Sequence, residues 1–239
     1  LIVGHGKFKD SINNAYKVAK EGNNLVTIGI EPTYASTAYG YIQFDESSDK
    51  KILNAFPVKT FAEKPHKKLA KRFLLSGDFL WNAGMFFWKV ETFMNNMKNL
   101  MPELTSLVIK IAPKLAEGKS FNGLWDKIKP ESIDFGLLEK ANNIYVVTAN
   151  FKWNDVGSWR ALYDVLNPND DGNIIRGNGK VIDGENNLIQ SDKNFTAIIG
   201  LDNVVVVNTK DATLVVKKDD VEKVKDLVSF LEKKKKDLI

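Results

Sequence analysis

The sequence predicts an α/β fold over residues 1–168, in which helices cover the faces of a layered sheet, and a small β module with a terminal helix over residues 169–239. Two observations carry this prediction. In the first part, apolar and β-branched runs alternate with helical patterns, as they do in layered α/β domains. From Asp170 onward, Asn, Gly and Asp separate short apolar runs, which is typical of short strands joined by tight turns.

The composition limits the chemistry that the chain can perform. With 239 residues, 44% of them hydrophobic, the chain can bury a full core. It has no cysteine and only two histidines, so disulfides, thiolate metal sites and histidine-rich metal sites are excluded. A metal ion must therefore be held by oxygen ligands, which favours a hard cation such as Mg²⁺.

The charge pattern and the apolar runs indicate neither nucleic acid nor membrane as a partner. The net charge is +4, but much of the excess lies in Lys233–Lys236, which we interpret as a solvated helix end. The aromatic residues are not interleaved with basic ones, as they would be on a surface that binds nucleic acid. No apolar run reaches the roughly 18 residues that span a bilayer, and the first residues do not resemble a signal peptide. We expect a soluble, cytoplasmic protein.

The first part begins with an αβ unit. Helical spacing over residues 10–20 ends at Gly22, and the apolar run Leu25–Ile30 follows as a buried strand. Gly4–Lys7 lacks the loop length of a phosphate cradle, and we interpret it as a turn. The further predicted elements are strands at 38–44 and 58–62 around a charged loop at 45–51, a helix at 67–75, a strand at 83–90, and helices at 91–100 and 104–115.

The second part has a repeat of seven residues. Ile174, Val181 and Leu188 recur at this spacing, which indicates strands stacked as coils of a small β-solenoid, although irregular hairpins give the same pattern. We favour the solenoid. Strands at 204–207 and 213–216 flank a turn, and a final amphipathic helix from Val221 to Leu231 is predicted to pack back on these strands.

Polar residues stand at three places where the pattern predicts core. Glu63 and Lys64 end an apolar strand, where ligand crevices form in open α/β sheets, although a strand that ends in a turn looks the same. Asn82 lies among aromatic and apolar residues, so it either binds a ligand hydroxyl or caps a neighbouring turn. Asp155 is either a helix N-cap or a Mg²⁺ ligand.

Five segments follow one another along the chain in a definite order: Gly29–Ile42, Phe61–Pro65, Leu80–Trp88, Pro130–Lys140 and Phe151–Trp159. Taken together, they resemble the ordered motifs of the mannose-1-phosphate guanylyltransferases among the sugar nucleotidyltransferases. Asn203–Val216 with the last helix resembles the C-terminal module of that family.

The resemblance implies a fold and an activity. It implies a Rossmann-like nucleotidyltransferase sheet, incomplete at its N-terminus, before the β module, which would be similar to a left-handed β-helix. It also implies transfer of GMP from GTP to α-D-mannose 1-phosphate, giving GDP-mannose and pyrophosphate. No covalent enzyme intermediate is needed, because such transfers depend mainly on alignment and electrostatics.

The resemblance also implies a mannose 1-phosphate site. Glu63 would accept hydrogen bonds from mannose hydroxyls and Asn82 would bind another hydroxyl. Lys64, near the sugar phosphate, would be catalytic because a cation there neutralises charge in the transition state. The backbone around Tyr39 and Gly40 would approach the sugar closely, which the missing side chain of glycine permits.

The resemblance implies a catalytic metal site as well, with Asp155 as a Mg²⁺ ligand. The glycine-rich signature of the family, its lysine motif and its first metal-binding Asp would lie before Leu1. The GTP contacts are therefore unassigned, and we expect the chain to be inactive alone. Ala35, Ser36 and Ala38 stand where the family usually has Pro, Glu and Gly, so the methyl group of Ala38 lies where the resemblance implies a close approach of the backbone to the sugar.

Two other functions are compatible with the same residues. One is the same chemistry on another pair of sugar 1-phosphate and nucleoside triphosphate. The other is a non-catalytic regulatory subunit that binds a sugar phosphate. The β module either forms a subunit interface or covers a sheet edge, and we expect a homodimer.

Overall fold

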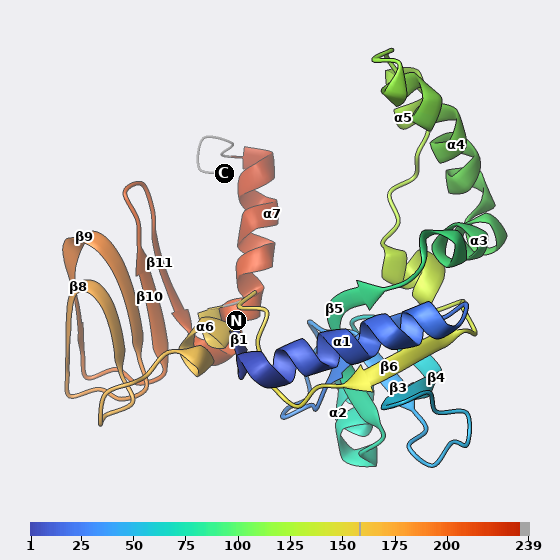
Figure 1. The fold of residues 1–239 in the computed structure, drawn as a ribbon. Helices are drawn as coiled ribbons and strands as arrows, with labels where there is room; N and C mark the ends of the chain where they lie inside the picture. Colours follow the sequence, from blue (N-terminus) through green and yellow to red (C-terminus); the bar gives the residue numbers. More distant parts are fainter. Residues whose placement is uncertain (158, 235–239) are drawn as a thin grey trace. The chain divides into compact units, whose positions relative to one another are not determined.

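A computed structural model describes residues 1–157 and 159–234 (Figure 1). Lys235 and Lys236 of the predicted lysine run, and Ser158 of the last motif, lie outside the described residues. The chain divides into two compact units, Ile2–Trp153 and a second one that contains Leu1 and the residues from Asn154 onward.

The first unit is built on strands that close into a ring. The ring closes because β4 is long enough to pair with β6 through residues 55–57 and with β3 through residues 58–62. β2 and β6 are parallel, and the other pairs in the ring are antiparallel. In ring order the strands are β2 (Leu25–Ile30), β5 (Phe79–Phe87), β3 (Tyr41–Phe44), β4 (Ala55–Ala62) and β6 (Ile144–Thr148). The short strands β1 (Ile2–Val3) and β7 (Lys152–Trp153) pair separately.

Helices and one π turn cover this ring, so the predicted α/β class is confirmed. α1 buries Ala15, Val18 and Ala19 against strand residues such as Val26 and Val147. The helices are α1 (His5–Glu21), α2 (Lys67–Ser76), α3 (Val90–Leu100), α4 (Pro102–Ala116) and α5 (Asn122–Trp125), and the π turn is η1 (Asp134–Leu138). Among the described residues, no helix has both the length and the apolarity needed to cross a bilayer.

Local signals explain where several of these elements begin and end. α2 begins after His66, whose side chain accepts a hydrogen bond from the Leu69 N–H, and ends at Gly77 with a φ of 77°. The interpretation of Gly4–Lys7 as a turn is wrong in part: Gly4 caps α1 with a φ of 99°, and the next residues form its first helical turn. The strand predicted at 83–90 lies at 79–87, because α3 begins at Val90.

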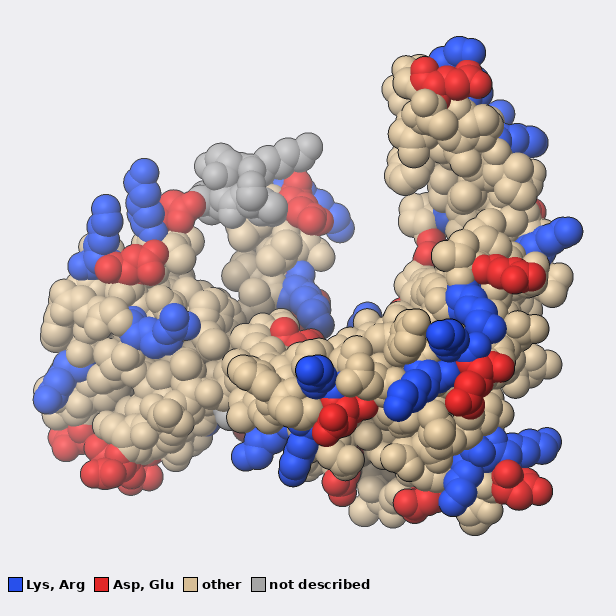
Figure 2. Space-filling view, in the orientation of Figure 1, with Lys and Arg blue, Asp and Glu red and all other residues tan. Residues whose placement is uncertain are grey.

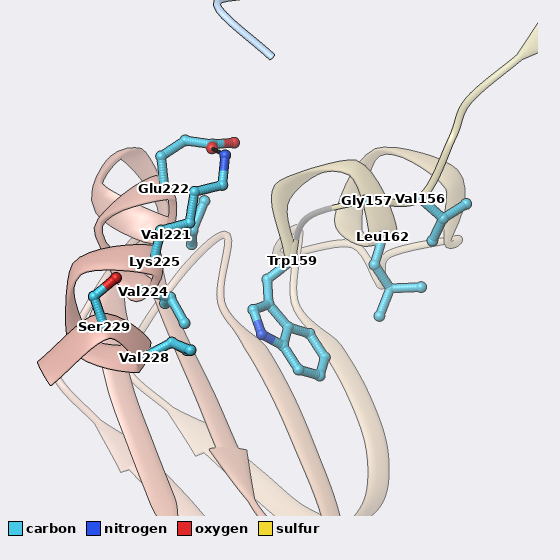
Figure 3. Close-up of a pocket in the computed structure, with 10 residues that line it drawn as sticks. All are labelled: Val156, Gly157, Trp159, Leu162, Val221, Glu222, Val224, Lys225, Val228 and Ser229. Carbon is cyan, nitrogen blue, oxygen red and sulfur yellow. Dashed lines mark hydrogen bonds and ion pairs between the residues drawn. The ribbon is translucent and has the colours of Figure 1, made fainter. Parts of the chain in front are cut away.

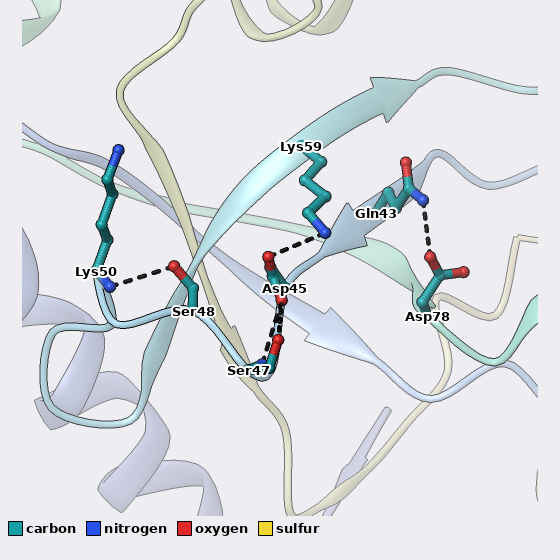
Figure 4. A network of polar contacts seen from close by, with 7 residues as sticks. All are labelled: Gln43, Asp45, Ser47, Ser48, Lys50, Lys59 and Asp78. Atoms are coloured by element: carbon teal, nitrogen blue, oxygen red, sulfur yellow. Dashed lines mark hydrogen bonds and ion pairs between the residues drawn. The ribbon is translucent and has the colours of Figure 1, made fainter.

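The loop between β3 and β4 has a polar network of its own (Figure 4). The Lys59 ammonium lies 2.9 Å from the Asp45 carboxylate, which also accepts from the Ser47 hydroxyl at 2.8 Å. Beside it, the Gln43 amide donates to Asp78 at 2.7 Å. These contacts fix the hairpin that the charged segment 45–51 predicts.

The second unit stacks its strands in parallel. Its sheet has the order β11-β10-β9-β8, and both β8/β9 and β9/β10 are parallel. Leu188 lies opposite Ile174 on one side and Val205 on the other. Parallel neighbours cannot be joined by a tight hairpin, so the predicted stacked coils are confirmed for these strands. The strands are β8 (Ile174–Ile182), β9 (Leu188–Ile199), β10 (Val204–Asn208) and β11 (Thr213–Lys217), the last two forming an antiparallel hairpin.

Buried asparagines hold the turns between these coils. Asn187 has no exposed surface, donates to the Leu201 carbonyl at 2.7 Å and accepts from the Val204 N–H at 2.8 Å. One coil earlier, Asn173 donates to the Gly184 carbonyl at 2.8 Å and accepts from the Asn187 N–H at 2.9 Å. These amides complete the hydrogen bonding of backbone groups where the ladder stops.

The remaining described elements of the second unit are two helices and a 3₁₀ helix. Val221 of the 3₁₀ helix is 5% exposed and packs against Ile174 and Leu188. These elements are α6 (Trp159–Val165), the 3₁₀ helix η2 (Lys218–Lys223) and α7 (Val224–Lys234). The prediction that the final helix packs on the strands is correct only for Val221, because α7 itself buries none of its residues.

Acidic and basic side chains both occur on the surface drawn in Figure 2. Several form short pairs, such as Lys119 with Glu117 at 2.6 Å and Lys225 with Glu222 at 2.9 Å. Exposed pairs of this kind contribute about 0–1 kcal/mol each to stability.

We predict that Asn187→Leu lowers the free energy of unfolding by about 2–4 kcal/mol, because it removes the hydrogen bonds by which a fully buried amide holds the Leu201 carbonyl and the Val204 N–H. Chemical denaturation followed by circular dichroism measures this loss. Asn194→Leu is the matched control, since the Asn194 amide bonds only an exposed side chain, and its effect should stay below about 0.5 kcal/mol. Equal losses in both variants would contradict a structural role for the buried amide.

Candidate functional site

Three polar segments of the first unit meet where β3 pairs with both β4 and β5. Gly40 directly precedes β3, Glu63 directly follows β4, and Asn82 lies inside β5. The Asn82 N–H donates to the Gly40 carbonyl at 2.8 Å, so the two backbones are in direct contact. The pairing of these strands therefore brings residues far apart in the sequence to one place.

The side-chain amide of Asn82 is held on several sides. Its oxygen accepts from the Thr27 hydroxyl of β2 at 2.9 Å and from the Gly84 N–H at 3.1 Å. Its nitrogen donates to an oxygen of Asp134 at 3.2 Å. Because Gly84 offers only a donor, the amide oxygen must face it, and this fixes the orientation of the amide.

The carboxylate of Glu63 is nearly buried, with 8% of its side chain exposed. It lies 3.0 Å from the ammonium of Lys64, whose side chain is 62% exposed. A Cβ atom at Gly40 would collide with Oε2 of Glu63, so the carboxylate occupies space that only a glycine leaves open. The Glu63 N–H donates to Oε1 of Glu139 at 2.9 Å.

Lys64 has a left-handed backbone, with a φ of 45°. Such a conformation is uncommon for a residue other than glycine and costs about 1–3 kcal/mol. Strain of this kind is concentrated at functional sites, where the surrounding contacts maintain it. In this conformation the lysine lies beside the carboxylate of its own neighbour, Glu63.

Burial shifts the acid–base behaviour of the site. Burial raises the pKa of Glu63 above its usual value, and the nearby Asp134 and Glu139 carboxylates add to the rise, while Lys64 opposes it. Burial likewise raises the pKa of Asp134, and Lys64 again opposes the shift. The site thus gathers carboxylates whose charged forms are disfavoured unless a ligand or a cation compensates them.

Tyr39 contributes its ring to the core of this unit. The ring is 8% exposed and packs edge-on against Trp81 at 5.0 Å and Trp153 at 5.6 Å between centroids. A ring packed in this way holds the backbone of the following residue, Gly40, in place.

Asp155 belongs to the second unit, in a tight loop before α6. Its Oδ1 accepts from the Gly157 N–H at 3.0 Å, and the Asn154 side chain accepts from the Val156 N–H at 2.7 Å. Val156 between them has a φ of 55°, which is rare for a β-branched residue. The bond to Gly157 forms a turn ahead of the helix, so the loop presents an exposed carboxylate.

The carboxylate side chains of the described residues offer few ligands for a divalent cation. In the part of the chain that the structure describes, no group of three or more His, Cys, Asp or Glu side chains is arranged to hold a metal ion. A single exposed carboxylate such as Asp155 nevertheless fits Mg²⁺, which usually takes one or two carboxylates and completes its shell with phosphates and water.

The first unit thus brings together Gly40, Glu63, Lys64 and Asn82, while Asp155 lies in the other unit. Sequence reasoning gave no role to the residues that bond to this group: Thr27, Asp134 and Glu139. The sequence signal that could have identified Asp134 and Glu139 is the segment Pro130–Lys140, in which these two acidic residues flank an apolar stretch.

We predict that Glu63→Gln changes the pH dependence of stability. The pKa of Glu63 is raised in the folded protein, so protonation of this carboxyl group stabilises the fold. This stabilisation is fully present below the unfolded-state pKa of about 4.3 and is lost as pH rises through the folded-state pKa. As pH rises from about 4 to neutral, the free energy of unfolding of the variant should therefore increase relative to that of the wild type. Urea unfolding at a series of pH values measures this, and parallel profiles for the two proteins would contradict it.

The ring of mixed strands, the polar junction at one of its corners and the stacked β coils define a nucleotidyl transferase domain followed by a β-helix. A Nucleotidyl transferase family model matches residues 2–171, and a MannoseP isomerase/GMP-like beta-helix domain model matches residues 171–231. The chain belongs to the nucleotidyl transferase family.

Its relatives narrow the family further and confirm the resemblance that the motifs indicate. A mannose-1-phosphate guanylyltransferase of Escherichia coli is 34% identical over 230 residues, covering 94% of this chain and 49% of the relative. One from Klebsiella pneumoniae is 34% identical over 235 residues, covering 97% of this chain and 50% of the relative. The chain thus spans about half the length of these curated relatives.

Solved structures support the same grouping. A crystal structure from Thermus thermophilus, named a mannose-1-phosphate geranyltransferase, matches with a TM-score of 0.84 and 27% identity, over 97% of this chain and 67% of that one. A structure named mannose-6-phosphate isomerase from Helicobacter pylori matches with a TM-score of 0.56 and 27% identity, over 65% of this chain and 61% of that one.

Proposed function

We propose that this chain is the sugar-binding part of an enzyme that transfers GMP from GTP to α-D-mannose 1-phosphate, giving GDP-mannose and pyrophosphate. The family and the names of the relatives support this proposal. The observation that carries it is the junction of Gly40, Glu63 and Asn82, where hydrogen-bonding groups with little exposure gather on one sheet corner.

The groups at this junction suit a hexose. The Glu63 carboxylate accepts hydrogen bonds, and hydroxyl groups of the sugar donate them. Asn82 keeps one amide N–H for a hydroxyl oxygen, because its oxygen and its other N–H are already bonded within the protein. The missing Cβ of Gly40 leaves the space that the Glu63 carboxylate occupies beside Asn82.

Lys64 is the cation of this site. Its ammonium pairs with Glu63 and is mostly exposed, so rotation of the flexible side chain can carry it to a phosphate oxygen. Charge neutralisation by a positioned cation is the main catalytic contribution available in such transfers. We assign Lys64 this role on the mannose 1-phosphate.

In the reaction, an oxygen of the sugar phosphate attacks the α-phosphorus of GTP, and the bond from that phosphorus to the β-phosphate oxygen breaks. Pyrophosphate leaves with the electron pair of this bond. A divalent cation, which we propose to be Mg²⁺ held in part by Asp155, neutralises phosphate charge when bound. The side chains of this chain bind and align the sugar phosphate.

The test is an assay of the complete protein with GTP, mannose 1-phosphate and Mg²⁺, with GDP-mannose separated by anion-exchange chromatography. Other nucleoside triphosphates and sugar 1-phosphates, offered one at a time, measure specificity. Product only from another pair would replace the assigned substrates. No product from any pair, together with tight binding of mannose 1-phosphate, would make the protein a sugar-phosphate-binding subunit.

We predict that Asp155→Asn lowers kcat by at least about 100-fold while the Kd for mannose 1-phosphate changes by less than about threefold, because a metal-binding charge is lost and the sugar contacts stay. Steady-state kinetics and calorimetric titration give the two values. Asp192→Asn, an exposed carboxylate in the same unit, is the control and should change neither. Equal losses of turnover and of binding would show that Asp155 is structural.

We also propose that the protein acts on small molecules in the cytoplasm, where GTP is abundant, and not on nucleic acid.

We further propose that the protein is a homodimer, because the second unit exposes apolar side chains near a cavity. This cavity of about 590 Å³ lies between α6, η2 and α7 (Figure 3) and is lined by apolar residues such as Trp159 and Val221. On α7, Leu227 and Phe230 are 44% and 51% exposed. Apolar side chains exposed together in this way are typical of interfaces.

We predict that the double variant Leu227→Glu/Phe230→Glu is monomeric, because it places two negative charges on the exposed apolar face of α7. Size-exclusion chromatography with light scattering measures the mass of each protein. Phe195→Glu changes an aromatic residue that is 65% exposed on β9 and should leave the dimer intact. A monomeric wild type would end the dimer proposal.

A further inference from the structure

The π turn η1 is anchored in the core of the first unit by its apolar residues. Leu137 and Leu138 are 0% and 1% exposed in the core cluster that contains Phe61 and Leu80, the latter two from β4 and β5. The Glu139 N–H donates to the Asp134 carbonyl at 2.9 Å, which closes a turn of five residues. π turns are rare, and those that interrupt α-helices are frequent at functional sites.

This turn changes where its end residues point. In an α-helix, side chains five residues apart project roughly 140° from each other around the axis. The wider π turn reduces this angle, so both ends can face the same neighbouring elements. Asp134 reaches the amide of Asn82 on β5 at 3.2 Å, and Glu139 reaches the N–H of Glu63 after β4 at 2.9 Å.

The two bonds hold different parts of the site. The first fixes one N–H of the Asn82 amide, and with Thr27 and Gly84 on its oxygen the amide cannot rotate without losing bonds. The second holds the backbone at Glu63, next to the strained Lys64. Binding groups that are ordered before the ligand arrives need not be ordered by it, and affinity rises accordingly.

We propose that Asp134 and Glu139 are positioning residues for the mannose 1-phosphate site, with Asp134 orienting the Asn82 amide and Glu139 fixing the Glu63 backbone. This inference rests on the proposed function for its kinetic consequences. Its structural content, an amide held by a carboxylate, does not depend on which sugar is bound.

The kinetic test uses the complete protein. Asp134→Ala should raise the KM for mannose 1-phosphate about tenfold, as expected for the loss of a hydrogen bond to a charged group, while the KM for GTP stays unchanged. Asp134→Asn retains an acceptor oxygen of the same shape, and it should recover most of this loss. Glu139→Ala and Glu139→Gln should behave in the same way.

Glu131→Ala is the matched control, because Glu131 lies in the same segment but only pairs with Lys140 at 3.6 Å. It should match the wild type. Equal increases in both KM values for Asp134→Ala and Glu139→Ala, or no recovery in the Asn and Gln variants, would overturn the positioning roles.

A second measurement does not require activity. In protein with ¹⁵N-labelled asparagine, exchange of the Asn82 side-chain amide protons with water should accelerate about tenfold in Asp134→Ala and stay slow in Asp134→Asn. Unchanged exchange in Asp134→Ala would overturn the role of Asp134. An inactive wild type that still shows this pattern would refute the proposed function and leave the positioning intact.

Discussion

The site depends on one constraint: the amide of Asn82, placed inside a β-strand, must be held by hydrogen bonds from within the protein on its oxygen and on one N–H. A polar group left unpaired there costs about 1–3 kcal/mol. The partners come from β2, β5 and η1, through Thr27, Gly84 and Asp134. The pairing of β2 with β5 shifts register between Thr27 and Gly29, and Gly84 has a φ of 67°, so both strands depart from regular geometry beside this amide.

The same corner of the ring concentrates negative charge. Asp134 and Glu139 add to the raised pKa of Glu63, and Lys64 is the cation that opposes their effect. A core that only needed stability would avoid partly buried carboxylates with raised pKa values and a lysine in a left-handed conformation. Such costs are typical of binding sites, where groups are kept ready for a ligand.

The β module solves a related problem with neutral groups. Where its coils turn, Asn173 and Asn187 bond to backbone groups that the parallel ladder leaves unpaired. Each is a buried amide at equivalent places of successive coils, since Ile174 and Leu188, the residues that follow them, lie opposite each other. In both units, a side-chain amide completes hydrogen bonding where the strands cannot.

The sequence by itself determined the elements with strong local signals. Leu25–Ile30 is a continuous apolar run, His66 and Gly77 bound a helix, and the charged segment 45–51 separates two strands, so these predictions are confirmed. The order of motifs also located Glu63, Lys64 and Asn82 as candidate site residues before any geometry was known. Such signals are local, because capping, turn chemistry and periodicity act over a few residues.

Only the tertiary structure decided what those residues contact. The closure of the strand ring and the exposure of α7 are tertiary features of this kind. So are the hydrogen bonds of Asp134 with Asn82 and of Glu139 with Glu63, which join residues 52 and 76 positions apart in the sequence. No local periodicity encodes these bonds, because they arise when Leu137 and Leu138 pack against residues of β4 and β5 and bring the π turn to Asn82 inside β5 and to Glu63 after β4. The physical reason is that a long-range hydrogen bond forms only after the core has fixed the distance between its partners.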